Sequence, residues 1–272
     1  IASAAPFLAG YIGTLTTSPI NVSRTGYTEK EVVDPETINF KVGGAFHYKI
    51  TENTEAVVMG YWGTGNTVYT GSDRYSLRGL KMGQYKFELN SKNWFLRAWT
   101  TQENAGDSYN ATVTTRLTNE KIKPSPTWYP EYGQAFLNFK LSGFTDIDAH
   151  NAARAFADQG RPAASSSQFK QLFDQVRSVP ISKGGGLFVD KTDLYSVEGQ
   201  YNFSHVTHKF ADILVGGNFR RFSLNSQGTL FADSAGIIPI NEYGGYLQIL
   251  RKLMNEKLTL TGSVRYDKNQ NF

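Results

Sequence analysis

Long segments in which apolar and polar residues alternate run through this chain, and they restrict its fold more than any other feature of the sequence. In residues 38–50, every second residue is apolar or glycine: Ile38, Phe40, Val42, Gly44, Phe46, Tyr48 and Ile50. The residues between them are polar or small: Asn39, Lys41, Gly43, Ala45, His47 and Lys49. Because successive side chains of a β-strand point to opposite faces, the segment predicts a strand with one apolar and one polar face.

The same pattern recurs in two groups of segments. In the first group, residues 56–62, 80–89 and 94–101 follow residues 38–50, and the second group consists of residues 194–204, 211–222, 243–252 and 258–267. The sequence therefore predicts about eight strands, four within residues 36–101 and four within residues 194–267. Residues 1–35 lead into the first strand as a loop or strand, residues 102–193 form a long connection, and residues 268–272, ending at Phe272, begin another loop.

The predicted strands are long, and the connections between them alternate in length. Strands of about ten to thirteen residues span roughly 33–43 Å, whereas strands of soluble domains usually have about five or six residues. The short connections are residues 51–54, 90–93, 205–209 and 254–257, and the long ones are residues 63–75, 103–193 and 223–241. This pattern is typical of a transmembrane antiparallel up-and-down β-barrel with short periplasmic turns and long extracellular loops. The predicted fold class is therefore all-β, in the form of a membrane barrel.

The connection over residues 102–193 is too long to lack secondary structure. Its sequence predicts a helix that begins at Thr145 or Asp146 and ends at Gly160. A second helix is predicted from near Ser167 to Pro180, because apolar residues recur there at helical spacing. We therefore expect the longest extracellular loop to be partly helical.

Composition excludes several classes of protein. No segment approaches the roughly 18 apolar residues that a membrane helix needs, and the mean hydropathy is -0.39, so a helical membrane protein is excluded. The net charge of +4 is dispersed rather than gathered into a basic block, so no nucleic-acid partner is predicted. The absence of cysteine excludes disulfides and thiolate metal sites. The first residues lack an initiator methionine and a basic region, so we expect any signal peptide to lie upstream or to have been removed.

Two candidate chemical motifs also have simpler explanations. Ser167 and Lys170 match the S-x-x-K motif of penicillin-binding enzymes, but the companion motifs are missing and the segment is predicted to be an amphipathic helix. A second group carries donors for a metal ion, although helix capping and surface exposure explain the same residues. This group is Asp146, Asp148, His150 and Asp158. We predict no enzymatic activity, no cofactor and no metal site.

Two sets of side chains are candidates for function in such a barrel. Charged and polar residues of the polar parity are expected to face the lumen, where they line a transport path or contact a plug; they are Lys41, His47, Arg97, Glu198, Gln200, Arg220 and Arg265. Aromatic residues near strand ends or on the apolar parity are expected to form a girdle at the membrane interface, with ligand stacking as the alternative. They are Tyr48, Trp62, Tyr85, Trp94, Tyr201 and Tyr266.

Several stretches resemble the barrels of TonB-dependent outer-membrane receptors. The run GNTVYTGSDRYSLRGLKMGQYKFEL, continuing into NWFLRAWTTQENAGDSYNAT, is similar to the early barrel of these receptors, particularly of the branch with a carboxypeptidase-regulatory-like domain at its N-terminus. The stretches AHNAARAFADQGRP, VEGQYNF and INEYGGYLQILRKLMNEKLTLTGSVRYDKNQNF are similar to later parts of the same barrel. The resemblance covers residues 34–272.

The resemblance implies a barrel of 22 strands with a plug in its lumen, of which this chain shows about eight strands and neither the plug nor an energy-coupling box. It implies that the complete protein imports a scarce solute, such as a ferric siderophore, a glycan or a peptide, across the outer membrane of a Gram-negative bacterium. The implied partners are outer-membrane lipid, the protein's own plug and remaining strands, the inner-membrane TonB energy-coupling protein and, as an optional partner, a surface lipoprotein lid. Two alternatives stay open: a passive pore or small eight-stranded outer-membrane barrel with an adhesive or structural role, and a soluble extracellular β-rich binding module.

Overall fold

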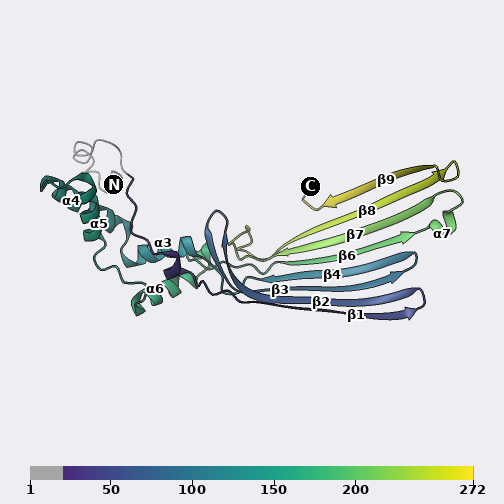
Figure 1. The fold of residues 1–272 in the computed structure, drawn as a ribbon, viewed down its shortest axis with the longest axis horizontal. Helices are drawn as coiled ribbons and strands as arrows, with labels where there is room; N and C mark the ends of the chain where they lie inside the picture. The colour runs from purple at the N-terminus through teal and green to yellow at the C-terminus, as the bar shows by residue number, and fades with distance from the viewer. Residues whose placement is uncertain (1–20, 272) are drawn as a thin grey trace.

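A single antiparallel sheet contains all the strands of the computed structural model, which describes residues 21–271 (Figure 1). Its long strands follow one another in chain order: β1 (Asn39–Thr51), β2 (Thr54–Thr70), β3 (Arg74–Ser91), β4 (Trp94–Asn104), β6 (Asp193–Asn202), β7 (Asp212–Leu224), β8 (Ile238–Leu253) and β9 (Leu258–Asn269). The short β5 (Tyr109–Asn110) pairs with β3. Among the described residues β1 and β9 form the two edges and do not pair with each other, so the sheet is open.

The all-β prediction is confirmed, with four long strands before the long connection and four after it. The eight long strands vary in length from 10 residues in β6 to 18 in β3, so the longest of them exceed the expected length of about ten to thirteen residues. β9 continues to Asn269, so the loop predicted to begin at residue 268 begins later. Residues 1–20 and Phe272, and with them the expectation about a signal peptide, lie outside the described residues.

The strand register separates the side chains into two faces, as the alternation predicts. Across the first four strands, Phe46 lies opposite Val58, Val58 opposite Phe87, and Phe87 opposite Ala98. The same rows continue through Val197. The neighbouring row on the other face is mainly polar and charged: it runs from His47 through Val57 to Glu88, Arg97 and Glu198. We call these the apolar face and the polar face of the sheet.

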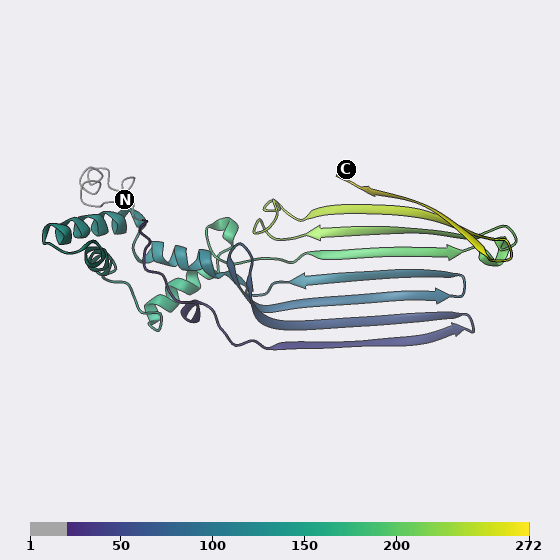
Figure 2. The same cartoon turned by 45° about the horizontal axis from the view of Figure 1, so that its top comes forward.

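The apolar face is exposed along its whole width. Phe46 on β1 is 67% exposed and Val264 on β9 is 64% exposed, and large apolar side chains on the strands between them are also exposed. The helices of the long connection lie beyond one end of the sheet and cover neither face (Figures 1 and 2). An apolar surface of this extent is rare on a soluble monomer and marks contact with a membrane or a partner.

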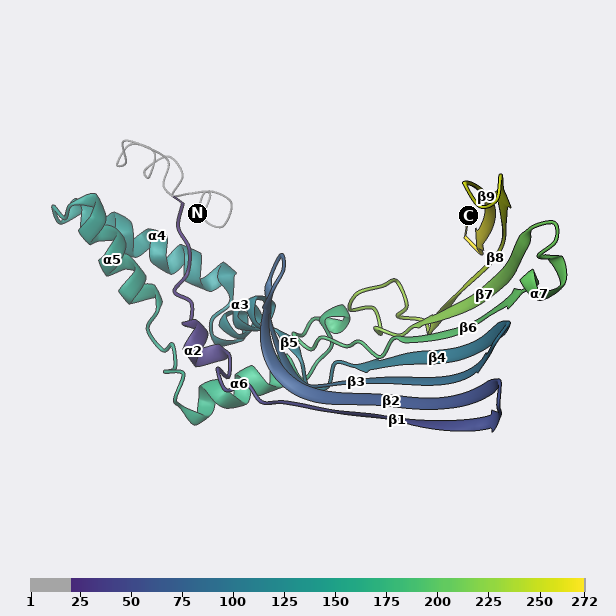
Figure 3. The ribbon, with the colours of Figure 1, turned by 45° about the vertical axis from the view of Figure 1, so that its right-hand side comes forward.

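The prediction of a long loop over residues 63–75 is wrong. β2 and β3 continue through this region and form a tall hairpin whose tip is residues 71–73, with Tyr69 opposite Tyr75 (Figure 3). The ladder shifts register between Gly65 and Thr67, and Asn66 accepts a hydrogen bond from the Gly79 backbone at 2.7 Å. The Gly, Thr and Asn residues here resemble a loop in the sequence because they form a bulge, which bends the two strands without ending their pairing.

The other connections agree better with the alternation of lengths. Two-residue turns follow β1 and β3, and a one-turn helix, α7 (Ser204–Thr207), lies between β6 and β7. All of these, and the turn between β8 and β9, lie at one end of the sheet (Figure 1). The opposite end carries the hairpin of β2 and β3, the loop over residues 225–237, and the helices.

Helices occupy most of the long connection. They are α3 (Ala111–Ile122), α4 (Ser125–Leu141), α5 (Asp146–Ala157) and α6 (Ser167–Arg177), followed by a single 3-10 turn, η2 (Ile181–Lys183). α5 and α6 are the two predicted helices, and the Thr145 and Ser166 side chains cap their N-termini. A short helix, α2 (Glu29–Val32), precedes the sheet. None of the helices within residues 21–271 is long and apolar enough to cross a membrane.

α3 and α4 were not predicted, because their sequences are poor in helix formers. α3 is rich in threonine, and the buried Thr114 and Thr118 hydroxyls donate to carbonyls one turn earlier. α4 contains Pro130 in its interior and has a small hydrophobic periodicity. Tertiary packing compensates: Trp128, Tyr132 and Phe136 on α4 are buried against Ala149, Ala153 and Ala157 on α5.

Asp233 closes the loop over residues 225–237. Its carboxylate accepts hydrogen bonds from the Ser226 hydroxyl at 2.7 Å, from the Gly228 backbone at 2.6 Å, and from the Ser226 backbone. Burial raises the pKa of Asp233, but these hydrogen bonds outweigh it and leave the pKa at about 2.

A depressed carboxyl pKa stabilises the loop only while the group is ionised. The contribution is therefore complete above the ordinary value of 3.8 and is lost as the pH falls through about 2. We expect Asp233→Asn to open the loop at neutral pH, measured as faster hydrogen exchange of the Leu230 and Phe231 amides, which donate to the Ser226 hydroxyl. Equal protection in the variant and the parent would show that other contacts hold this loop.

Candidate functional site

The polar face of the sheet carries all seven side chains predicted to face a lumen. Strand register places them on β1, β4, β6, β7 and β9: they are Lys41, His47, Arg97, Glu198, Gln200, Arg220 and Arg265. The structure brings Arg97 and Glu198 into contact, with 3.0 Å between Nη1 and Oε1. Lys41 and His47 lie near one edge of the sheet and Arg265 lies near the other, so the seven do not form one compact site.

An ion-pair ladder crosses β3, β4 and β6 on this face. Glu88 is its centre: its carboxylate lies 2.6 Å from Lys86 Nζ and 2.9 Å from Arg97 Nε, and Arg97 continues the ladder to Glu198. The Glu88 side chain is only 7% exposed. A buried carboxylate is stable only when its charge is paired and hydrogen-bonded, and here two cations provide the pairing.

Glu88 was not among the predicted candidates, although a signal for it existed. Arg97 lies opposite Glu88 in the hairpin closed by residues 92–93. If the residues are counted outwards from this turn on both strands, the sequence alone places Glu88 opposite Arg97. A shallow depression of about 300 Å³ adjoins the ladder, and Tyr61, Gln84 and Trp99 are among the residues that line it.

A second polar cluster lies further across the same face, on β6 to β9. The Tyr246 hydroxyl donates to Gln200 Oε1 at 2.6 Å, and Arg265 donates to Asn218 Oδ1 at 3.1 Å while pairing with Asp267 at 2.6 Å. The Tyr246 ring lies over Gly216, the residue opposite it on β7. An aromatic ring packed on a cross-strand glycine helps to fix the register of the two strands.

The six aromatic residues predicted for a girdle all lie on the apolar face. Tyr48, Trp94 and Tyr201 lie close to the short turns, and Trp94 is directly opposite Tyr201. Trp62, Tyr85 and Tyr266 lie further along their strands. The placement fits one aromatic row near the short turns, and the interfacial role stays a prediction.

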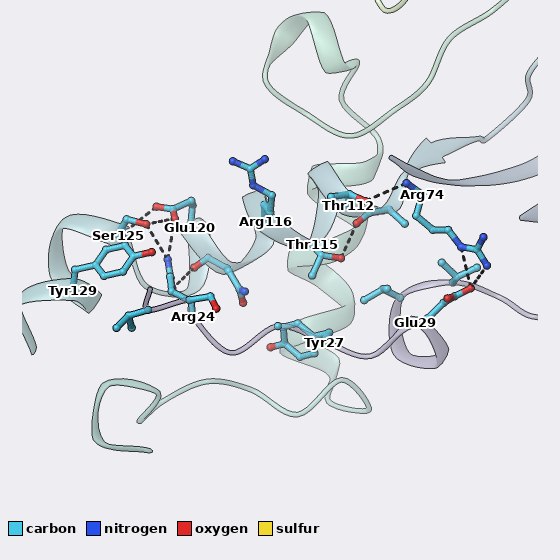
Figure 4. A pocket seen from close by; sticks show the side chains of 17 residues that line it. Arg24, Tyr27, Glu29, Arg74, Thr112, Thr115, Arg116, Glu120, Ser125 and Tyr129 are labelled. Atoms are coloured by element: carbon cyan, nitrogen blue, oxygen red, sulfur yellow. Dashed lines mark hydrogen bonds and ion pairs between the residues drawn. The ribbon is translucent and has the colours of Figure 1, made fainter. Parts of the chain in front are cut away.

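Beyond the sheet, a hollow of about 610 Å³ lies between α3 and the segment over residues 22–33 (Figure 4). We call it the outer hollow. One face of α3 lines it with Thr112, Thr115, Arg116, Asn119 and Glu120. The volume is within the range of small-molecule sites.

Two ion pairs fix the segment over residues 22–33 to the rest of the protein at the two ends of the outer hollow. At one end Arg24 pairs with Glu120 at 2.9 Å and donates to the Lys123 carbonyl at 2.6 Å, which satisfies the C-terminus of α3. At the other end Arg74 Nε donates to Glu29 at 3.1 Å. Figure 4 shows Arg116 between these two pairs.

The electrostatics of the outer hollow differ from one lining residue to the next. Burial raises the pKa of Glu120, but hydrogen bonds from Ser125 and the charge of Arg24 outweigh it, so the pKa of this carboxyl is lowered and Glu120 is anionic. The exposed Arg116 has no hydrogen bond or ion pair with any residue that the structure describes. Sequence reasoning missed this site because it joins residues as far apart as Arg24 and Glu120, which are 96 positions apart and meet only in the fold.

The residues of the two candidate chemical motifs are either exposed or bonded to other groups of the protein. Ser167 and Lys170 are both exposed, and the buried residue of their segment is Phe169. The four metal candidates are each engaged elsewhere. Asp146 pairs with Lys140, Asp148 bonds to Thr145, His150 bonds to Tyr132, and Asp158 accepts from Trp128. Within residues 21–271 no three or more His, Asp and Glu side chains gather into a group that could hold a metal.

No family model and no curated protein matches this chain.

Proposed function

We propose that the chain is part of the barrel of a TonB-dependent outer-membrane transporter, which imports a scarce solute such as a ferric siderophore, a glycan or a peptide. The observation that carries the proposal is the open sheet of eight long strands with one exposed apolar face and one charged face. Lipid contact on the apolar face and a polar lumen on the other would give both faces the solvent that their side chains suit.

The open edges favour a larger barrel over a small closed one. The outward backbone groups of β1 and β9 make no ladder with each other, and a bilayer provides no water to bond them. Further strands, on the same polypeptide or on other chains, would complete the pairing. A plug in the lumen would contact the ion-pair ladder of Glu88, Arg97 and Glu198, and the energy for moving it would come through the inner-membrane TonB protein.

The helical region would then be extracellular and would capture the solute. Short turns lie at the opposite end of the sheet, which fits the periplasmic side of an outer-membrane barrel. In this proposal the protein breaks and forms no bonds, needs no cofactor, and works as a transporter in the outer membrane of a Gram-negative bacterium.

Membrane fractionation and the intact mass of the native polypeptide test the proposal. We expect the protein in the outer-membrane fraction, extracted only by detergent, with a mass several-fold above the 30.3 kDa of this chain. A native mass near 30.3 kDa in the same fraction would favour the small barrel or pore. Recovery in the soluble fraction without detergent would contradict both membrane readings.

A further inference from the structure

We infer that the outer hollow binds an acidic solute and that Arg116 is the residue that recognises its negative charge. The inference rests on the proposed function, because it names the class of solute that the extracellular region would capture. It is carried by three features of the outer hollow: its charge, the state of its side chains, and its fixed walls.

The charge of the outer hollow favours an anion. Three arginines line it, Arg24, Arg74 and Arg116, against two glutamates, Glu29 and Glu120. Each glutamate is already paired, Glu120 with Arg24 and Glu29 with Arg74. The guanidinium of Arg116 is therefore the one charge of the lining that lacks a counter-charge among the residues the structure describes.

Guanidinium groups suit carboxylates and phosphates because their parallel N–H donors match two anionic oxygens. Neighbouring polar groups extend the site along α3. The Thr112 hydroxyl lies one turn before Arg116, and the Thr115 hydroxyl lies one residue before it. Thr115 donates its proton to the Ala111 carbonyl at 2.7 Å, so its oxygen is left to accept from a ligand.

The Tyr27 ring that lines this hollow is not free to stack on a ligand. The Tyr27 ring is covered by Arg161, whose guanidinium carbon is 3.8 Å from the ring centre, and by Phe169 at 4.2 Å. Its hydroxyl donates to the Pro162 carbonyl at 2.8 Å. With this ring engaged, the unpaired charge of Arg116 is the main recognition group, and the glycans and peptides of the proposed function would meet it with carboxylates.

The walls of the outer hollow are held in place before a ligand arrives. At one end of the segment over residues 22–33, Arg24 pairs with Glu120 on α3, and at the other end Glu29 pairs with Arg74 on β3. Tyr109, next to the start of α3, donates from its hydroxyl to the Val32 carbonyl at 2.7 Å. A fixed hollow loses little conformational entropy on binding, which favours affinity.

Calorimetry on the native polypeptide in detergent tests the inference with four probes. Trigalacturonate and triglutamate represent acidic glycans and acidic peptides, and galactotriose and triglutamine are their neutral counterparts. We expect an acidic probe to bind, its neutral counterpart not to bind, and the affinity to fall as salt is raised. Binding of only one acid assigns the solute to a glycan or to a peptide. Equal binding of the neutral and acidic probes would overturn the inference.

Arg116→Gln should weaken acid binding about tenfold or more, the effect of losing one charge-assisted hydrogen bond. The matched control is Lys121→Gln, which removes one positive charge from the same helix but does not line the outer hollow. Since Arg116 has no hydrogen bond or ion pair in the described protein, its substitution removes no internal polar interaction, and circular dichroism should be unchanged. Equal weakening by both variants would contradict a specific role for Arg116.

The two proposals fail in different ways. Binding in detergent does not depend on where the protein resides, so recovery in the soluble fraction together with acid binding would contradict only the transporter. Outer-membrane location without acid binding would contradict only the assignment of the outer hollow.

Discussion

Arginine in place of Val264 should destabilise the sheet in a bilayer, whereas arginine in place of the adjacent Ser263 should be tolerated. Both residues are exposed on the edge strand β9, so neither substitution causes a clash within the described protein. Val264 belongs to the apolar face and Ser263 to the polar face. A cationic side chain on the lipid face costs about 2–4 kcal/mol near the midplane, but little in a lumen.

Folding into lipid vesicles measures this difference. With the native polypeptide, we expect Val264→Arg to lower the free energy of unfolding, obtained from urea titration in vesicles, by about 2–4 kcal/mol. Ser263→Arg should change it by less than about 1 kcal/mol. The identical new side chain, one residue apart, serves as its own control. Equal effects at the two positions would mean that the faces do not meet different solvents.

The second large effect is expected at Arg97, which bridges Glu88 and Glu198. Arg97→Met keeps an unbranched apolar stem but leaves the buried Glu88 with Lys86 as its one cationic partner among the described residues. Breaking a buried pair typically costs about 3–5 kcal/mol. Because the Arg97 side chain is about a third exposed, we expect the free energy of unfolding to fall by about 2–3 kcal/mol.

A double variant separates lost pairing from lost packing. Glu88→Leu together with Arg97→Met removes the buried charge as well as its partner, so it should recover much of the stability that Arg97→Met loses. The readout is again the free energy of unfolding in lipid. If the double variant is less stable than Arg97→Met by the full cost of a second deletion, the two residues act independently and the ladder is not a unit.

The alternation of residues was enough to predict the strands and their faces. In residues 38–50 the period of two places Phe46 on one face and His47 on the other, and the register reproduces both positions. The prediction succeeds because strand periodicity is a local property. The same locality explains why the start of α5 was predicted at Thr145 or Asp146, since the Thr145 side chain bonds to a backbone group three residues later.

The failures share a long-range origin. The hairpin of β2 and β3 continues through a glycine-rich stretch because each strand has a partner there, so local loop preference is overridden by pairing. α4 tolerates Pro130 because Trp128, Tyr132 and Phe136 are buried on α5. The outer hollow depends on contacts between Arg24 and Glu120, which no local pattern encodes.

Accessibility of single labels along β9 tests the central claim most directly, because these 272 residues contain no cysteine, so a cysteine introduced in β9 is the only one in this part of the protein. Spin labels at positions 261 to 266 of the native protein in lipid vesicles would report contact with oxygen, which partitions into lipid, and with a water-soluble nickel chelate. We expect labels at Gly262, Val264 and Tyr266 to favour oxygen, and labels at Thr261, Ser263 and Arg265 to favour the chelate. Uniform accessibility to the water-soluble reagent at all six positions would contradict a membrane-spanning sheet.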